Sequence, residues 1–221
     1  MKSRLVVVLS PVIFLIVCCL GACNSASEEE IVGDAETVAK LSNENKLAQS
    51  FVADSLSRDQ LHVFQQRGQQ KLDDFISYTA IVSNKAYNKE MRFAAKEQMM
   101  QLFTDSTVMI EAGVSEAQEK ARPLFEFAEE VYTSQYDSVK IKVLYAKAKE
   151  PEPKNTGSYE GSVTADVSIK RYLAGKDVFS TTATFTAATV VQQVQKQFGN
   201  DSSRVWTVML GEIKQLSVAL Q

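Results

Sequence analysis

The chain has 221 residues, with 24 basic and 27 acidic side chains and a formal net charge of −3 at pH 7. Its single histidine, His62, and its three cysteines, Cys18, Cys19 and Cys23, supply too few nitrogen and sulfur ligands for a zinc, haem or iron–sulfur site. The same scarcity excludes a Cys–His nucleophilic pair, and the slightly acidic balance argues against nucleic acid as a partner.

The first 22 residues have the pattern of a signal peptide. Lys2 and Arg4 give a short basic start, and apolar stretches follow over residues 5–9 and 11–20. A transmembrane helix is the alternative. The apolar run is near the lower length limit for crossing a bilayer, however, and the acidic residues 28–30 follow it in place of a basic flank.

The segment Leu20-Gly21-Ala22-Cys23 closes the apolar run with small residues before a cysteine. It resembles the lipobox of bacterial lipoproteins, and this resemblance implies cleavage before Cys23 and attachment of fatty acid, such as palmitate, at that residue. Cleavage there would remove two cysteines and two basic residues, so the mature chain would carry a formal charge of −5 and no thiol for a disulfide. We therefore expect a membrane contact through a lipid anchor.

Residues 23–56 are predicted to form an acidic tether. Between residues 24 and 46, six acidic residues face two basic ones and no aromatic residue occurs, too little apolar surface to offset the entropy of ordering. The run from Asn24 to Glu30 resembles the acidic export signal of surface-exposed lipoproteins in Bacteroidota-type bacteria, and a plain solvated spacer is the alternative. By resemblance to lipoprotein sorting rules, Asn24 after the cysteine favours the outer membrane, with the domain facing the periplasm or the cell surface.

The folded domain is predicted over residues 57–221 and begins with helices. Ser57 supplies a helix start, and apolar positions then recur at steps of three and four at Leu61, Phe64, Leu72, Phe75, Ile76, Thr79 and Val82. Asn88 is expected to cap a second helix, whose inner stripe is Met91, Ala94, Ala95, Met99, Leu102 and Phe103. A short strand over residues 108–110 and a third helix over residues 116–132 follow, and Pro123 must kink that helix or start its second part.

After Tyr136 the apolar period changes from 3.6 to 2, which predicts strands. We expect four strands near residues 139–145, 163–170, 179–194 and 204–216, joined by a loop over 151–157 and by turns at 174–176 and 199–201. Strands joined by short turns form an antiparallel meander. In the second strand, Asp166 is expected to point away from the apolar row of Val163, Ala165 and Val167.

The predicted order of elements is helices first, then a short strand, another helix and a long meander. This order resembles that of the nuclear-transport-factor-2-like (NTF2-like) superfamily. The resemblance covers about Arg58 to Gln221 and includes the alternating segment Val139-Lys140-Ile141-Lys142-Val143. It implies an α+β fold in which N-terminal helices pack on a curved antiparallel β-sheet, a cone that leaves a pocket. A cystatin-like or other helix-on-sheet α+β domain is the alternative.

The family's enzymes place an aspartate or a His–Asp pair inside the cone, which directs attention to buried acids. Glu212 is the one carboxylate in the alternating row that holds Trp206 and Leu210, and burial would make it a ligand-anchoring or proton-transferring group. A position in water at the strand end is the alternative. The aromatic residues predicted to line the same pocket are Trp206, Tyr145 and Tyr78.

No residue earns a catalytic assignment from the sequence, and no metal or cofactor is expected. The predicted function is a non-catalytic binding or interaction module of the bacterial envelope, anchored in the outer membrane and contacting an envelope protein or an apolar ligand. A structural subunit of an envelope assembly is one alternative. A small-molecule-binding enzyme of the cone fold, using Glu212 or another buried acid, is the other.

Overall fold

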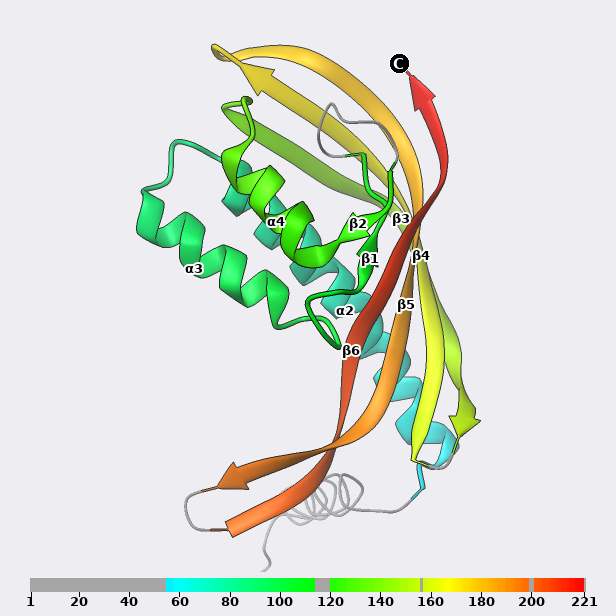
Figure 1. Cartoon of the computed structure of the whole chain (residues 1–221). Coiled ribbons are helices and arrows are strands. Elements are labelled where there is room, and N and C mark those ends of the chain that lie inside the picture. The colour runs from blue at the N-terminus through cyan, green and yellow to red at the C-terminus, as the bar shows by residue number, and fades with distance from the viewer. Residues whose placement is uncertain (1–54, 114–119, 156, 199–200, 221) are drawn as a thin grey trace, which may run out of the picture. The chain divides into compact units, whose positions relative to one another are not determined.

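The computed structural model describes residues 55–113, 120–155, 157–198 and 201–220, which form three helices and a six-stranded sheet (Figure 1). The chain divides into residues 1–40 and 41–221, and the described part belongs to the second unit. The predicted signal peptide, Cys23 and nearly all of the predicted tether lie outside the described residues. Within the described ranges, no helix is both long and apolar enough to cross a membrane.

Helix α2 (Arg58–Ser83) begins where the sequence predicts. The Ser57 hydroxyl accepts a hydrogen bond from the Gln60 backbone, and the Gln60 side chain accepts one from the Ser57 backbone, which together satisfy two N–H groups of the first turn. Its buried face consists of Phe64, Gly68, Leu72, Phe75, Ile76, Thr79, Val82 and Ser83. The predicted central helix is therefore confirmed, with Phe75 and Ile76 at its middle.

Helix α3 (Lys89–Met100) has the predicted cap, because the Asn88 side chain accepts a hydrogen bond from the backbone of Met91. Its predicted inner stripe is wrong in part, since Met91 is 46% exposed and Ala94 is also exposed. The buried positions are Arg92, Ala95 and Met99. The Arg92 guanidinium donates to the carbonyls of Val82 and Tyr132 and lies over the Tyr132 ring at 4.6 Å, so a satisfied cation occupies a helix contact expected to be apolar.

The predicted helix over residues 116–132 is shorter than expected. Residues 114–119 lie outside the described part, and strand β2 (Arg122–Pro123) pairs antiparallel with β1 (Met109–Ile110). Helix α4 (Leu124–Thr133) starts immediately after Pro123. Proline cannot donate a backbone hydrogen bond, so it fits at a helix start and not in a helix interior.

The sheet has the order β2-β1-β6-β5-β4-β3. The four long strands are β3 (Ser138–Asn155), β4 (Ser158–Leu173), β5 (Lys176–Phe198) and β6 (Asp201–Leu220), and they form the predicted antiparallel meander. Strand β1 joins β6 in parallel. The strands curve around α2 and α4 (Figure 1), so the α+β architecture of N-terminal helices on a curved, mostly antiparallel sheet is confirmed.

The predicted loop over residues 151–157 is wrong, because β3 continues through two prolines to Asn155. Strand β3 is the edge of the sheet, where a missing backbone N–H breaks no ladder on the open side. The turn itself is tight and contains Gly157, whose φ is 87°. At the other end of β4, Ala174 (φ 51°) and Gly175 (φ 74°) form the predicted hairpin turn between β4 and β5.

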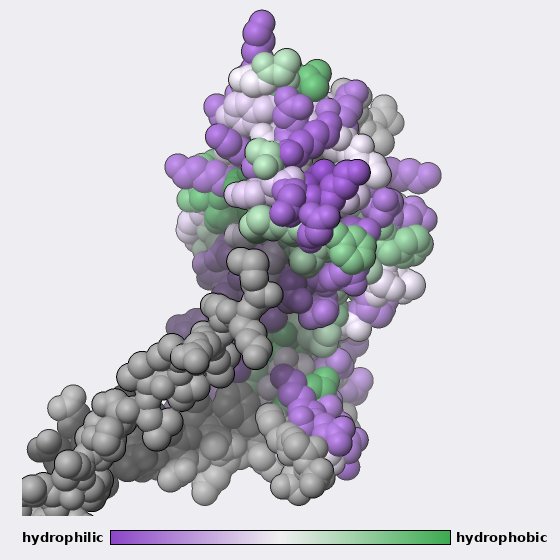
Figure 2. Space-filling view, turned by 90° about the vertical axis from the view of Figure 1, so that its left-hand side faces the viewer, coloured by the Kyte–Doolittle hydropathy of each residue, from purple (hydrophilic) through white to green (hydrophobic). Residues whose placement is uncertain are grey.

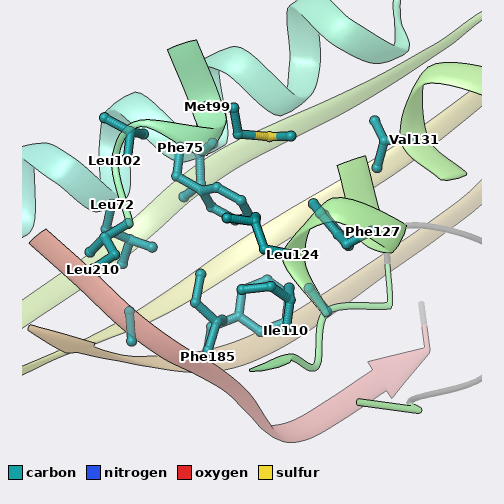
Figure 3. Close-up of a cluster of buried hydrophobic side chains, with 14 of the residues drawn as sticks. Leu72, Phe75, Met99, Leu102, Ile110, Leu124, Phe127, Val131, Phe185 and Leu210 are labelled. Atoms are coloured by element: carbon teal, nitrogen blue, oxygen red, sulfur yellow. The ribbon is translucent and has the colours of Figure 1, made fainter. Parts of the chain in front are cut away.

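Hydrophobic side chains from the helices and from the inner face of the sheet, the face toward the helices, form two clusters. In the larger one, here called the main core, the Phe75 ring packs edge-to-face on Phe103 at 5.3 Å and lies 5.7 Å from Phe127. Figure 3 shows Phe75 and Phe127 among the buried side chains of this core. The smaller one, here called the end cluster, consists of Phe64, Val191, Trp206 and Val208, with Leu56 and Tyr159 partly buried against it.

Helix α2 lies close to the sheet between the two clusters, at Gly68. A Cβ atom added at Gly68 would lie 3.0 Å from Cγ2 of Thr189 on β5. On the other side of Thr189, a Cβ at Gly161 would lie 2.9 Å from its hydroxyl oxygen. Small residues at these positions therefore let the helix and two strands meet, and this contact separates the end cluster from the main core.

Candidate functional site

The structure does not bring the four predicted pocket residues together. Tyr78 is half-buried against the main core, whereas Trp206 is buried in the end cluster beside Tyr159, at a ring distance of 5.6 Å. Tyr145 is 60% exposed, and the Glu212 side chain is 52% exposed. The four residues therefore do not line one pocket, contrary to the prediction.

A β-bulge in β6 turns Glu212 outward. Leu210 pairs with Thr189 and Ile213 pairs with Ala187, so two residues of β6, Gly211 and Glu212, oppose one residue of β5. The extra residue shifts the alternation, and Ile213 faces the core in the place where Glu212 was expected. Glu212 lies in water with its carboxylate 3.3 Å from the Lys214 ammonium, so the expectation of a buried acid is wrong. An isolated glycine within a strand pattern is the sequence signal that marks this bulge.

A second bulge, in β3, has the same effect on Tyr145. Val143 pairs with Val167 and Tyr145 pairs with Asp166, which leaves Leu144 as the extra residue. Tyr145 then shares the outer face of the sheet, the face away from the helices, with Asp166. On this outer face, the Asp166 carboxylate accepts a hydrogen bond from the Thr184 hydroxyl at 2.7 Å. Asp166 therefore points away from the buried row of Val163, Ala165 and Val167, as predicted. Three consecutive apolar residues at 143–145 break the alternation of apolar and polar positions in the sequence. This break is the signal from which the bulge could have been predicted.

The interior of the described domain contains cations and hydroxyls at its buried polar positions. These positions are Thr79, Ser83, Arg92, Arg171, Thr181 and Thr189, and no described aspartate or glutamate is among them. The Arg171 guanidinium, on β4, donates to the carbonyl of Gly113 at 2.6 Å and stacks on Phe179 at 4.1 Å. Among residues whose placement is described, no group of three histidine, cysteine or acidic side chains could hold a metal ion.

A polar groove between α2 and β6 is one candidate binding site among the described residues. It has a volume of about 210 Å³ and is lined by Arg67, Gln70, Lys71, Asp74, Thr207 and Val208. We call it the α2–β6 groove. Its floor on β6 adjoins the end cluster, because Val208 belongs to both.

The charges of the α2–β6 groove come from successive turns of α2. The Arg67 guanidinium lies 5.5 Å from the centre of the Phe64 ring, which places a cation at the border of the end cluster. Next to the groove, partial desolvation raises the pKa of Asp73, and the neighbouring Asp74 carboxylate raises it further. Cations and a carboxylate in one groove can bind the carboxylate and the amine, respectively, of a polar ligand or of a partner's side chains.

The side of the domain that carries α3 shows no continuous apolar face. Figure 2, seen from the left of Figure 1, shows apolar residues scattered between polar ones over that side. The exposed large hydrophobic residues of α3 are Met91 and Phe93, and the Lys96 ammonium lies 5.1 Å from the centre of the Phe93 ring. The α2–β6 groove therefore remains the stronger candidate.

No family model and no curated protein matches the sequence. The chain is similar to the structure of a putative scytalone dehydratase from Novosphingobium aromaticivorans DSM 12444, with 9% identity, a TM-score of 0.40 and coverage of 73% of this chain and 90% of that one. It is also similar to a hexachlorocyclohexane dehydrochlorinase (LinA) Type2, with 10% identity, a TM-score of 0.39 and coverage of 72% and 93%. A third similar structure is the Kfla4162 protein from Kribbella flavida, with 6% identity, a TM-score of 0.34 and coverage of 70% and 94%.

These comparisons correct one expectation. The sequence led us to predict that the chain is not an enzyme, but two of the three similar structures are named as a dehydratase and a dehydrochlorinase. The prediction that the chain is not an enzyme is therefore withdrawn. At identities of 6–10% the similarity concerns the arrangement of helices and strands and transfers neither activity nor substrate to this chain.

Proposed function

We propose that this chain is a lipid-anchored binding protein of the outer membrane, and that its α+β domain binds an envelope protein or a small polar ligand at the α2–β6 groove. The lipid anchor is supported by the sequence Leu20-Gly21-Ala22-Cys23 directly after the apolar run. The binding role is supported by one observation, a groove of about 210 Å³ that presents both cations and a carboxylate.

The anchor is tested at Cys23. Two or three acyl chains hold a protein stably on a membrane, whereas one chain holds it only marginally. Cys23→Ala should abolish incorporation of a fatty-acid analogue and should release the protein from the membrane fraction or leave it unprocessed. Cys18→Ala and Cys19→Ala, which change the predicted signal peptide only, are the matched controls and should keep the label. Labelling that persists in Cys23→Ala would remove the anchor from the proposal.

The side of the membrane is tested with the acidic run. If residues 28–30 direct surface display, replacing these three glutamates by alanine should remove the protease sensitivity of the protein on intact cells. The control replaces Asp34, Glu36 and Glu44 by alanine, which makes the same charge change further along the predicted tether. Equal protease access in the two variants and the parent would leave residues 28–30 as a plain spacer.

The groove is tested by site-specific photo-crosslinking in whole cells. A photoreactive residue at Gln70, inside the groove, should give a discrete crosslinked product with a partner protein, and Lys71→Ala should reduce it. A photoreactive residue at the exposed Gln98 of α3, combined with Lys89→Ala, is the matched control. The same products from both positions would contradict a binding role for the groove. For a small ligand, loss of thermal stabilisation in Lys71→Ala is the equivalent measurement.

A further inference from the structure

The folded domain divides its charges between its helical and its sheet half. Residues 57–133, which include the three helices, contain 12 acidic and 9 basic side chains. Residues 134–221, which include the four long strands, contain 8 acidic and 11 basic side chains. The domain as a whole is neutral, but the sheet half is positive, so any electrostatic attraction to an anion is directed to one side of the molecule.

The excess positive charge is concentrated on the outer face of the two strands at one edge of the sheet. Five exposed lysines lie there, and we call them the basic strip: Lys140, Lys142, Lys147 and Lys149 of β3, and Lys170 of β4. Lys140 pairs directly with Lys170 across the two strands. Like charges directly opposite each other destabilise a sheet, and here each lysine has its own partner: the Lys140 ammonium lies 4.9 Å from the centre of the Tyr172 ring, and Lys170 lies near Asp177.

Two of the acidic side chains of this face lie at the margins of the basic strip, and a third, Asp166, lies at its centre, directly opposite Tyr145. Lys149 pairs with Glu152 at 2.9 Å, and Lys170 pairs with Asp177 at 3.5 Å. The Asp166 carboxylate accepts its hydrogen bond from Thr184. Within the described residues, no carboxylate lies within ion-pair distance of Lys142 or Lys147. These two lysines outnumber the one aspartate, so the centre of the strip has a net positive charge.

Two apolar side chains occupy that centre. The bulge in β3 leaves Leu144 54% exposed and Tyr145 60% exposed, between Lys142 and Lys147 in sequence. Tyrosine has an apolar ring and a polar hydroxyl, and it is favoured at the boundary between lipid headgroups and acyl chains. Lysines bind headgroup phosphates, and their long aliphatic stems tolerate an apolar neighbour.

We propose that the basic strip, with Leu144 and Tyr145 at its centre, docks on an anionic phospholipid surface. The lysines contact headgroup phosphates and the two apolar side chains enter the headgroup layer. The inference rests on the proposed lipid anchor, because the anchor keeps the domain within a tether's length of the membrane. That proximity raises the effective concentration of phosphates, so that a weak surface contact becomes populated.

The experiment uses the mature lipidated chain, reconstituted into vesicles of phosphatidylcholine with or without phosphatidylglycerol. Leu144→Cys would be the single free thiol if Cys23 is acylated, and it is labelled with a polarity-sensitive fluorophore. Its emission should shift to the blue in anionic vesicles only, and high salt should reverse the shift because salt screens exposed charges. The matched control labels Phe93→Cys of α3, whose native side chain has a similar exposure of 52%, and it should not respond.

Charge-reversal variants test the strip directly. Lys142→Glu with Lys147→Glu should lower the docked population of the labelled protein by roughly tenfold or more, since each lysine near an anionic surface contributes favourably. Lys89→Glu with Lys120→Glu makes the same change of net charge on the helical half and should leave the blue shift intact.

The outcomes separate this inference from the proposed anchor. Protein that does not float with vesicles refutes the anchor, whereas protein that floats without a blue shift refutes the strip alone. An equal shift in neutral and anionic vesicles also overturns the proposal, because phosphate charge is then not required. The blue shift could also occur without vesicles and disappear when residues 28–30 are replaced by alanine. The basic strip would then bind the acidic segment of this chain, and the lipid proposal would be wrong.

Discussion

The main core and the end cluster are built on the inner face of the same sheet, yet they differ in what covers them. The main core is enclosed by α2, α3, α4 and β1, and its Phe75 ring contacts the rings of Phe103 and Phe127. Among the described residues, the end cluster combines only Phe64 of α2, Leu56 and Tyr159 with Val191, Trp206 and Val208. A cluster with few buried neighbours opens at a lower free energy than one enclosed on several sides. We therefore expect the two clusters to contribute unequally to stability.

The largest effect is expected at the middle of α2. Phe75→Ala should lower the free energy of unfolding by about 3–5 kcal/mol, because it removes a fully enclosed ring and leaves a cavity. Lys71→Ala, one turn earlier on the groove side of the helix, should change it by less than about 0.5 kcal/mol. Chemical denaturation followed by circular dichroism measures both. Equally mild effects would mean that the main core does not depend on this face of α2.

An intermediate effect is expected in the end cluster. Phe64→Ala should cost about 2–3 kcal/mol, less than Phe75→Ala, because the surrounding residues are less enclosed and can collapse into the space. The single tryptophan, Trp206, reports on this cluster by fluorescence. In Phe64→Ala its transition should occur at lower denaturant than the circular dichroism transition. Coincident transitions in this variant would show that the two clusters unfold as one unit.

A smaller effect is expected at the contact that separates the clusters. Gly68→Ala should destabilise by about 1 kcal/mol, because overpacking against Thr189 outweighs the better helix propensity of alanine. Thr189→Ser removes the Cγ2 atom that would be 3.0 Å from the new methyl group. The double variant should therefore be more stable than Gly68→Ala, as thermal unfolding would show. No rescue would mean that the strain lies elsewhere.

The smallest effect is expected from charge on the water side of α2. Because the pKa of Asp73 is raised above its ordinary value of 3.8, its ionisation costs stability as the pH rises through the folded-state pKa. Asp73→Asn should thus be slightly more stable than the parent at neutral pH, by less than about 0.5 kcal/mol, and equal to it well below pH 3.8. Melting temperatures at several pH values measure this. A parent that gains stability relative to Asp73→Asn as the pH rises would contradict the sign.

Local sequence patterns were sufficient for the order of elements and for several of their ends. Capping side chains fixed the starts of α2 and α3, since Ser57 and Asn88 bond to backbone groups within three residues. In β4, which pairs with β5 without a bulge over residues 163–167, the predicted row of Val163, Ala165 and Val167 is buried. These features depend on neighbours in the chain, which is why the sequence alone predicts them.

The candidate site could not be predicted in the same way, because its residues depend on register and on distant partners. One extra residue in β3 and one in β6 change the direction of the side chains next to each bulge, and this placed Tyr145 and Glu212 on the outer face of the sheet. The α2–β6 groove joins residues as far apart in the chain as Arg67 and Thr207, which are 140 positions apart, and no local periodicity connects them. The sequence by itself determined an α+β chain with its helices first and its meander last. The tertiary structure alone decided which side chains share a surface, because strand register and helix approach are set by packing across the whole domain.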